Sequence, residues 1–279
     1  MITFPSAKVN LGLNIYNQRQ DGFHNMETIM YPLLFSDMLE IIQNTDWKEG
    51  EAVFTLSGYG LPVEGNLQEN LVFRAYSLLN EVYKLPPVRA CLYKKIPMGA
   101  GLGGGSSDAA FMLKLLNVKF ALGIQEQELE TYASKLGSDC AFFIRNKPVY
   151  IYGKGHELES IEFSLQGWYM VLLNPGIHSS TAEAYQGVKK KEIYDPNNSV
   201  KAIIQQPVAM WKDKLYNQFE PSVFARYPEL ETIKSALYQA GATYASMSGS
   251  GSSLFGLFTS PPKLTASLQE KMVYQGWLS

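Results

Sequence analysis

One glycine-rich stretch limits what this chain can fold into more than any other feature. Pro97–Ala110 reads "PMGAGLGGGSSDAA" and passes directly from clustered glycines into small residues that favour helix. Glycine is costly to order, because it loses more backbone entropy on folding than any other residue. Such a cluster before a helix is typical of a backbone that wraps closely around a ligand. Because unpaired N–H groups at a helix N-terminus bind anions, the stretch indicates a phosphate site.

Three other interpretations of this loop fit the sequence less well. The spacing Gly99-x-Gly101-x-x-Gly104 matches a dinucleotide-binding fingerprint, but a second helix follows where that fold requires a strand with a terminal acidic residue. A Walker loop requires Gly-Lys-Ser/Thr, and no lysine precedes Ser106. A tight structural turn needs only one glycine. A phosphate cradle without its own lysine is therefore favoured, with its positive charge supplied from elsewhere in the chain or by a metal ion.

The composition is that of a globular protein with a small-molecule ligand. The chain has 279 residues and a net charge of -2, which argues against a nucleic-acid partner, and its basic run Lys189–Lys191 is short. Cys91 and Cys140 lack a metal-ligand spacing, so we expect reduced thiols in the cytoplasm. The start "MITFPSAK" has no secretory pattern, and the apolar runs are too short to cross a membrane.

The first half of the chain mixes predicted strands and helices. Lys8–Ile15 alternates apolar and polar residues, which predicts a half-buried strand. Asn70 is expected to cap a helix that buries Leu71, Ala75, Leu78 and Val82. Further strands are predicted at residues 28–34, 39–43, 52–57 and 88–96, a helix from Ser106, and a second helix with Leu129, Tyr132, Ala133 and Leu136 on its apolar face and Gly137 as its C-cap.

The second half repeats strands and helices with clearer boundaries. "WYMVLLNPG" predicts a buried strand, and Ser180 with Glu183 predicts a capping box. Ser199 is expected to start a helix, and Pro228 and Gly241 to bracket another with Leu230, Ile233 and Leu237 buried. "TYASMSGSGSSLFGLF" reads as strand, turn and strand, followed by a terminal helix. These elements predict an α+β fold, with domains at residues 1–160 and 161–279.

Three further polar groups offer the chemistry that the glycine loop lacks. Lys8 and Asn10 lie on the first strand, and Asp139 follows the second helix. A second small-residue turn, "SGSGSS" at Ser248–Ser253, is expected to close over the same site.

Taken in order, these motifs resemble the GHMP kinases over nearly the whole chain. The matching segments are "SAKVNLGLNI", "DGFHNMET", "GLGGGSSDAA", "LGSDCAFF", "NPGIHSSTAEAY" and "MSGSGSSLF". The departures are Cys140-Ala141, where Val-Pro is usual, and serines in the last turn. The resemblance implies a two-domain α+β fold, with a ribosomal protein S5 domain 2-like N-terminal domain and a ferredoxin-like C-terminal domain.

The resemblance also implies an activity, an ATP-dependent kinase whose Mg²⁺ arrives with ATP. The extra glycines and the Asp-Gly-Phe-His element are similar to those of members that phosphorylate a cytidyl diphosphate of methylerythritol in the non-mevalonate isoprenoid route. A monomer or weak homodimer is expected. Two alternatives stay open, namely a family member that acts on another small alcohol and a non-catalytic nucleotide-binding module.

Residue roles follow from the same resemblance. Asp139 takes the proton of the substrate hydroxyl, and Lys8 pairs with Asp139 and balances the moving charge. Ser107 is a candidate Mg²⁺ ligand. The implied ATP-binding residues are Pro97, Met98, Gly99, Ala100, Gly101, Leu102, Gly103, Gly104, Gly105, Ser106 and Ser107 of the loop, with Asn70, Leu71 and Lys94 on the adenine side. The implied substrate-binding residues are Asn10, Phe23, His24, Thr181, Tyr185, Ser248, Gly249, Ser250 and Gly251, where Phe23 and Tyr185 stack on cytosine and His24 reads its edge.

Overall fold

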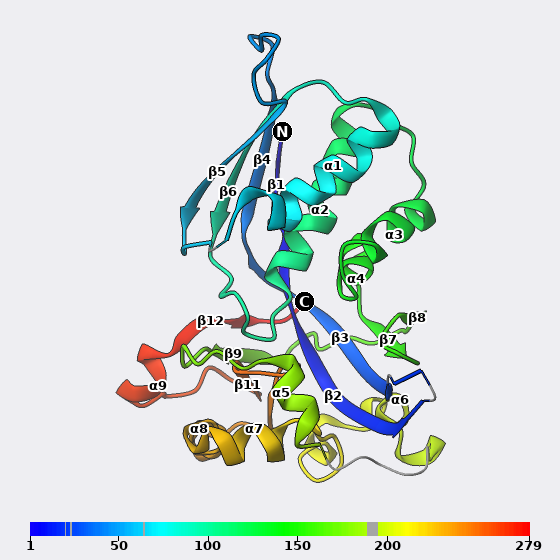
Figure 1. Ribbon diagram of the computed structural model, residues 1–279. Coiled ribbons are helices and arrows are strands. Elements are labelled where there is room, and N and C mark those ends of the chain that lie inside the picture. Colours follow the sequence, from blue (N-terminus) through cyan, green and yellow to red (C-terminus); the bar gives the residue numbers. More distant parts are fainter. Residues whose placement is uncertain (20, 23, 64, 189–194) are drawn as a thin grey trace. The chain divides into compact units, whose positions relative to one another are not determined.

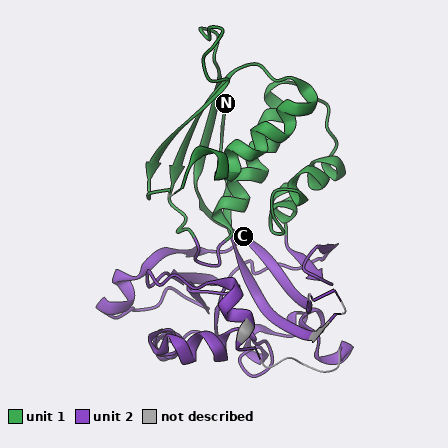
Figure 2. Ribbon diagram, viewed as in Figure 1, with its two compact units in different colours: residues 1–7, 34–98, 103–147 green, residues 8–33, 99–102, 148–279 purple. Residues whose placement is uncertain are grey.

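The structure, a computed structural model, describes residues 1–19, 21–22, 24–63, 65–188 and 195–279 (Figure 1). Phe23 and the basic run at 189–191 lie outside the described residues. The chain forms two compact units, each drawn from separate stretches of sequence (Figure 2). Unit 1 comprises residues 1–7, 34–98 and 103–147, and unit 2 comprises residues 8–33, 99–102 and 148–279. The continuous division at residue 160 stays a prediction.

Unit 1 is built on a four-stranded sheet with helices on one face (Figure 1). The strand order is β1 (Ile2–Thr3), β4 (Met38–Gln43), β6 (Val88–Lys94) and β5 (Phe54–Gly60). The only parallel pair of this sheet, in the described part of the chain, is β5 with β6. The helices of this unit are η1 (Leu67–Glu69), α1 (Leu71–Tyr83), α2 (Gly104–Lys119), α3 (Glu126–Ser134) and α4 (Cys140–Arg145).

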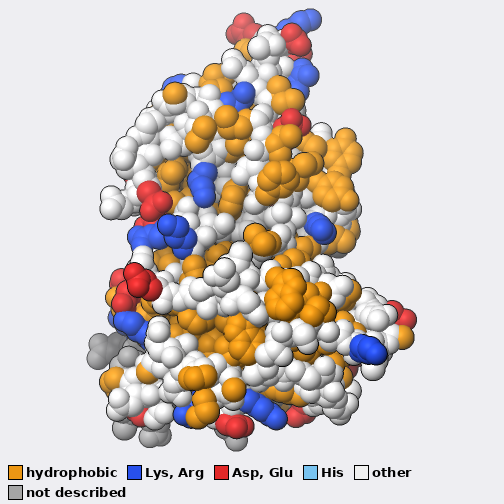
Figure 3. Space-filling model, turned by 180° about the vertical axis from the view of Figure 1, so that it is seen from behind, with side chains coloured by type: hydrophobic (Ala, Val, Ile, Leu, Met, Phe, Trp, Pro, Cys, Tyr) orange, Lys and Arg blue, Asp and Glu red, His pale blue; other side chains and the backbone are white. Residues whose placement is uncertain are grey.

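The two faces of this sheet differ in what covers them. Leu39, Ile41 and Leu92 are buried on the face that the helices cover. The alternate residues of the same strands are turned the other way, and the side chains of Ile42 and Tyr93 are 53% and 47% exposed. Figure 3 shows hydrophobic side chains gathered over this part of unit 1. Helix packing therefore explains only one face of the sheet.

Unit 2 contains a second four-stranded sheet, to which the predicted strand at Lys8–Ile15 belongs. Its order is β2 (Ser6–Gln18), β3 (His24–Ser36), β7 (Val149–Tyr152) and β8 (Glu157–Ser160). The strand predicted at Lys8–Ile15 is confirmed, but its half-buried character is wrong, since Lys8, Asn10 and Asn14 are buried as well as the apolar residues. Both faces of β2 are covered by other parts of the protein. The alternation of apolar and polar residues therefore does not predict which side chains of this strand are exposed.

The third sheet, also in unit 2, is fully antiparallel. Its order is β10 (Tyr244–Met247), β11 (Leu254–Phe258), β9 (Tyr169–Leu173) and β12 (Met272–Trp277). Leu230 and Leu237 pack with Val171 and Leu254 in its core. The helices of this unit are α5 (Thr181–Gln186), η2 (Pro196–Asn198), α6 (Val200–Ile204), η3 (Val208–Met210), α7 (Glu220–Arg226), α8 (Pro228–Gln239) and α9 (Ala266–Glu270).

Local signals placed many boundaries correctly. Asn70 caps α1 by accepting the N–H of Val72 at 2.9 Å, and Ser199 caps α6 by accepting the N–H of Ala202. Pro228 begins α8, whose buried residues are those predicted. The α+β class is confirmed. No helix in the described part of the chain is long and apolar enough to span a membrane.

Four predictions about elements are wrong. The buried residues of α1 are Val72, Ala75, Tyr76 and Leu79, whereas Val82 is 58% exposed. The C-cap residue of α3 is Lys135 rather than the predicted Gly137. Ser180 is the N-cap residue of α5, but its side chain makes no capping bond within the described residues, so the predicted capping box is absent there. The chain ends in strand β12 rather than in a helix, because this strand completes the sheet beside β9.

Candidate active site

The glycine loop adopts a backbone that other residues rarely adopt. Gly99, Gly101 and Gly103 have φ values of +63°, +77° and +70°. L-residues with a side chain avoid this left-handed region. The loop therefore needs glycine at alternate positions to turn its peptide groups, and a single structural turn does not account for it.

The centre of the loop lies in unit 2 and is hydrogen-bonded to two other motifs. The backbone N–H of Lys8 donates to the carbonyl of Leu102 at 3.0 Å, and the N–H of Ser253 donates to the carbonyl of Ala100 at 3.2 Å. The hydroxyl of Ser248 donates to the carbonyl of Gly101 at 2.8 Å. A side chain at Gly101 would collide with the backbone of Ser248. The first strand, the loop and the late glycine-serine turn are thus brought together, as the sequence predicted.

The helical end of the loop lies in unit 1. Gly103 occupies the N-cap of α2 and offers no side chain to the first N–H groups of the helix. The hydroxyl of Ser107 is fully buried and has no hydrogen-bond partner among the described residues. A buried hydroxyl of this kind costs free energy unless a ligand engages it. This end of the loop therefore has the open N–H groups and the hydroxyl that a phosphate requires.

Lys8 and Asn10 form the polar face of β2 near the loop. Lys8 is 3% exposed, which excludes the alternative of a solvated strand charge. Its ammonium donates to the amide oxygen of Asn10 at 2.6 Å, and the amide nitrogen of Asn10 donates to the hydroxyl of Thr28 at 3.2 Å. The backbone N–H of Asn10 donates to the hydroxyl of Ser248 at 3.2 Å. Asn10 therefore connects the lysine to the late glycine-serine turn.

Asp139 lies in unit 1, at the residue before α4. Its side chain does not cap that helix within the described residues, so capping does not explain the carboxylate. The neighbouring Ser138 hydroxyl donates to one of its oxygens at 3.4 Å. Cys140 beside it is buried, and burial raises the pKa of its thiol to about 11, so this cysteine is no nucleophile at neutral pH.

The residues predicted for the adenine side divide into two kinds. Asn70 and Leu71 lie at the N-terminus of α1, where Asn70 acts as the helix cap. Lys94 is buried, and its ammonium is paired with the carboxylates of Asp37 and Asp108. Burial alone lowers the pKa of Lys94, but the two carboxylates outweigh it and raise the value. The ammonium is thus engaged inside the protein, which favours a supporting role over direct contact with a base.

The residues predicted for the cytidine end lie together in unit 2. The rings of His24 and Tyr185 are stacked, with centroids 5.6 Å apart and planes at 22°. The hydroxyls of Thr181 and Ser250 are 2.9 Å apart. His24 therefore lies against Tyr185 itself, whereas the predicted partner of that ring, Phe23, is outside the described residues.

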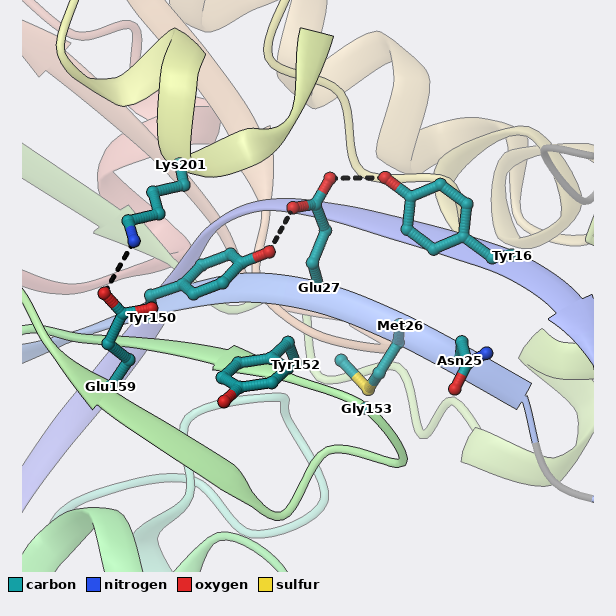
Figure 4. Close-up of a pocket in the computed structure, with 9 residues that line it drawn as sticks. All are labelled: Tyr16, Asn25, Met26, Glu27, Tyr150, Tyr152, Gly153, Glu159 and Lys201. Atoms are coloured by element: carbon teal, nitrogen blue, oxygen red, sulfur yellow. Dashed lines mark hydrogen bonds and ion pairs between the residues drawn. The ribbon is translucent and has the colours of Figure 1, made fainter. Parts of the chain in front are cut away.

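The sequence did not indicate a second polar network on the other face of β3. Glu27 is 1% exposed, and its carboxylate accepts from the hydroxyls of Tyr16 and Tyr150 at 2.5 and 2.6 Å (Figure 4). It also accepts from the amide of Asn14 at 2.7 Å and the N–H of Val200 at 3.0 Å. A buried carboxylate with four donors holds β2, β3, β7 and the start of α6 in place.

This network forms the wall of a cavity of about 480 Å³. Glu27 and Thr28 are adjacent on β3, so their side chains point to opposite faces of the sheet. Its lining residues are Tyr16, Asn25, Met26, Glu27, Tyr150, Tyr152, Gly153, Glu159 and Lys201 (Figure 4).

The described residues contain no cluster of three or more His, Cys, Asp or Glu that could hold a metal ion. Mg²⁺ commonly takes part of its coordination from the phosphate oxygens of a ligand. The unpartnered hydroxyl of Ser107 fits a supporting ligand of that kind.

Two family models match the chain. The model for the GHMP kinases N terminal domain matches residues 70–147, and the model for GHMP kinases C terminal matches residues 199–273. The first match includes the glycine loop and Asp139.

Curated relatives match over almost the full length. The 4-diphosphocytidyl-2-C-methyl-D-erythritol kinase of Bacteroides fragilis is 51% identical over 265 residues, 95% of this chain and 94% of the relative. The enzyme of the same name from Parabacteroides distasonis is 47% identical and covers 100% of both chains.

Solved structures show the same fold. The crystal structure of a 4-(cytidine 5'-diphospho)-2C-methyl-D-erythritol kinase aligns with a TM-score of 0.76 at 31% identity, over 92% of this chain and 90% of that chain. Mevalonate kinase of Methanococcus jannaschii aligns with a TM-score of 0.66 at 14% identity, over 97% of this chain and 92% of that chain, which shows the fold alone.

Proposed function

Since the chain belongs to the GHMP kinases and, within them, to the 4-diphosphocytidyl-2-C-methyl-D-erythritol kinases, we propose that it transfers the γ-phosphoryl group of ATP to the 2-hydroxyl of that cytidyl substrate. The chain is an ATP-dependent phosphotransferase of the non-mevalonate isoprenoid route.

One observation supports the site more than any other. A continuous set of hydrogen bonds joins Lys8, Asn10, Ser248 and Gly101, which come from the three motifs that define the family. Residues more than two hundred positions apart in sequence thus meet in unit 2. A glycine loop that served only as a tight turn would not need these partners.

The loop residues 97–107 bind the phosphates of ATP mainly through backbone N–H groups. The left-handed glycines orient these groups, and the absence of a side chain at Gly101 and Gly104 lets the backbone approach its neighbours closely. The hydroxyls of Ser106 and Ser107 add two donors at the N-terminus of α2. Asn70, Leu71 and Lys94 serve the adenine side, with Lys94 acting through the buried cluster that holds it.

The chemical step is assigned to Lys8 and Asp139. Asp139 accepts the proton of the acceptor hydroxyl, and the ammonium of Lys8 stabilises the negative charge that develops between the reacting oxygens. Asn10 orients that ammonium through its 2.6 Å hydrogen bond. When Mg²⁺ accompanies ATP, it neutralises phosphate charge, and Ser107 is the residue of this chain placed to support it.

The cytidyl end is assigned to unit 2. Tyr185 offers an aromatic face to cytosine, and His24 reads the edge of the base, with Phe23 as the second ring of the stack. Thr181 and Ser250 lie within hydrogen-bond distance of each other and serve the diphosphate, together with the glycines at 249 and 251. The two free cysteines agree with a cytoplasmic location, which we keep as part of the proposal. The expectation of a monomer or weak homodimer stays a prediction.

The test of substrate choice is a coupled ADP-release assay on the full chain. We expect turnover with 4-diphosphocytidyl-2-C-methyl-D-erythritol and none above background with mevalonate or homoserine. Preference for either of these alcohols would establish the alternative of a kinase with another substrate. ATP binding without any turnover would establish the non-catalytic module.

The test of the catalytic pair uses Asp139→Asn with Ser138→Ala as its matched control. The amide cannot accept the hydroxyl proton, so we expect kcat to fall about 10²–10⁴-fold while ATP still binds. Ser138→Ala removes the adjacent hydroxyl and should leave kcat within about threefold of the wild-type value. Near-normal turnover of Asp139→Asn would remove the base from the mechanism.

A further inference from the structure

Three charged side chains are buried together beneath the glycine loop in unit 1. Lys94 at the end of β6 contacts Asp37, which follows β3, and lies 2.7 Å from the carboxylate of Asp108 on α2. The side chains are 1%, 0% and 3% exposed, respectively. Burying charges costs several kcal/mol per ion and is often no more stable than an apolar core. Stability is therefore a poor explanation for this cluster.

The cluster is attached to both ends of the glycine loop. The second oxygen of Asp37 accepts the backbone N–H groups of Lys95 and Ile96, at 2.6 and 2.8 Å, directly before Pro97. At the other end, Asp108 is the fifth residue of α2, the helix that begins at the loop. The strand that enters the loop and the helix that leaves it are thus tied to the same ammonium.

Close packing at Gly104 links the two ends further. A Cβ at this position would lie 2.9 Å from Cγ2 of Ile96 and 3.2 Å from Nζ of Lys94. The first turn of α2 therefore rests on the residues that Asp37 and Lys94 hold. The backbone of this turn is in contact with Ile96 and Lys94. A change in the cluster is therefore expected to shift the N–H groups of the turn.

We propose that Lys94, Asp37 and Asp108 are positioning residues for the ATP phosphates, which set the geometry of the loop and the charge beneath the N-terminus of α2. The inference rests on the proposed function, since it names how that phosphate site is held. In this role the three residues act through the strand and the helix that they hold.

The charges in the cluster do not balance. Two carboxylates share one ammonium, and Oδ1 of Asp108 has no hydrogen-bond partner among the described residues. Lys94 on β6 and Asp37 after β3 are the charged groups that act on Asp108. The ammonium of Lys94 is therefore the group that holds both carboxylates, and the segments bonded to them, in place.

The first experiment measures ATP binding to the full chain by titration calorimetry, without acceptor, for the wild type and for Asp108→Asn. The variant keeps the shape of the side chain but replaces the ion pair with Lys94 by a weaker contact to a neutral amide. We expect the dissociation constant for ATP to be at least about fivefold higher for the variant than for the wild type.

The second experiment separates positioning from a merely structural role. Asp37→Asn removes the charge that holds the N–H groups before Pro97, so KM for ATP should rise about tenfold while KM for the cytidyl substrate stays within about twofold. Lys114→Met is the matched control, because Lys114 is a cation of the same helix that donates instead to the carbonyl of Ile144 at 3.0 Å. It should lower thermal stability without changing either KM.

The outcomes separate the inference from the function on which it rests. Equal dissociation constants of wild type and Asp108→Asn for ATP, or a rise in both KM values with Asp37→Asn, overturn the positioning role and leave the kinase assignment standing. A wild-type chain that does not bind ATP overturns the proposed function and this inference with it.

Discussion

Each unit buries acidic side chains, but the two units stabilise them in different ways. In unit 2, Glu27 is surrounded by neutral donors, two tyrosine hydroxyls, an amide and a backbone N–H. In unit 1, Asp37 and Asp108 share the ammonium of Lys94, and one oxygen of Asp108 stays without a partner among the described residues. The first arrangement satisfies its carboxylate, and the second leaves part of its charge uncompensated.

This difference matches what each cluster supports. The donors of Glu27 come from two strands, β2 and β7, and from helix α6, so the network acts as a rigid junction around Glu27 on β3. The Lys94 cluster lies against the first turns of α2, the helix end to which our proposal assigns the phosphates of ATP. A neutral network is suited to fixing a backbone, whereas an unbalanced charged cluster also responds to protons and to bound anions.

The largest effect on stability is expected from a variant that breaks the charged cluster. Lys94→Met leaves two buried carboxylates without a cation, so we expect the free energy of unfolding to fall by about 3–5 kcal/mol at neutral pH. Urea denaturation with the matched Lys114→Met variant as control measures it. A loss below about 1 kcal/mol would show that the ammonium is not needed to hold the carboxylates.

A smaller loss is expected from breaking the neutral network. Glu27→Gln replaces one acceptor oxygen with an NH₂ group that faces donors, so at least one hydrogen bond is replaced by a clash of donors. We expect the free energy of unfolding to fall by about 1–3 kcal/mol. Tyr150→Phe removes a single donor and should cost about 1 kcal/mol in the same denaturation experiment. Equal losses for the two variants would argue against a shared network.

The comparison is sharpened by pH. The pKa of Asp108 is raised to about 7 in the folded chain, above the value of about 3.9 for an unfolded aspartate. The native state then binds more protons than the unfolded state between these values, so the stability that Asp108 contributes falls as pH rises from about 4 to about 7. Its share of the slope is at most about 1.4 kcal/mol per pH unit.

The measurement is urea denaturation across that pH window for the wild type and for Asp108→Asn. The variant should lose this component of the slope, because its amide does not titrate. Identical slopes would mean that Asp108 is ionised throughout the window in both states.

The smallest effect is expected at an exposed ion pair beside the cavity in unit 2. Lys201 and Glu159 are 2.6 Å apart, but each side chain is 44% exposed. Solvent screens such pairs, so Glu159→Gln should change the free energy of unfolding by less than about 1 kcal/mol. Thermal denaturation at low and high salt tests it. A larger loss in the free energy of unfolding would show that this ion pair contributes to stability as a buried pair does.

Helices whose ends carry capping residues or proline were predictable from the sequence. Which face of each helix is buried was harder to predict. Caps at Asn70 and Ser199 and the proline at 228 each place a helix start through contacts within a few residues. Helix α1 has so many apolar residues that two different sets of them recur with the period of a helix, and either set could form its buried face. Packing against α2 decides that Val72, Tyr76 and Leu79 form the buried row rather than Leu78 and Val82.

The strand β2 shows a similar limit for alternation. Asn10 and Asn14 are four residues apart and should share a face. Asn10 donates to Thr28 and Asn14 to the adjacent Glu27, whose side chains point to opposite faces of β3. Gly12, with a φ of +67°, lies between the two asparagines and breaks the alternation. The tertiary packing of both faces is what makes this break possible.

The sequence by itself determined the residues whose role depends on local geometry. The glycine loop, the lysine strand, the late glycine-serine turn and the order of these motifs were all readable, because a left-handed backbone and a helix N-terminus need particular residues at particular spacings. Only the tertiary structure decided which buried charges support them. Asp37 lies 57 positions before Lys94, and Glu27 lies 173 before Val200. No local pattern encodes such contacts, since they arise when separate strands and helices pack and leave a charge that has to find a partner.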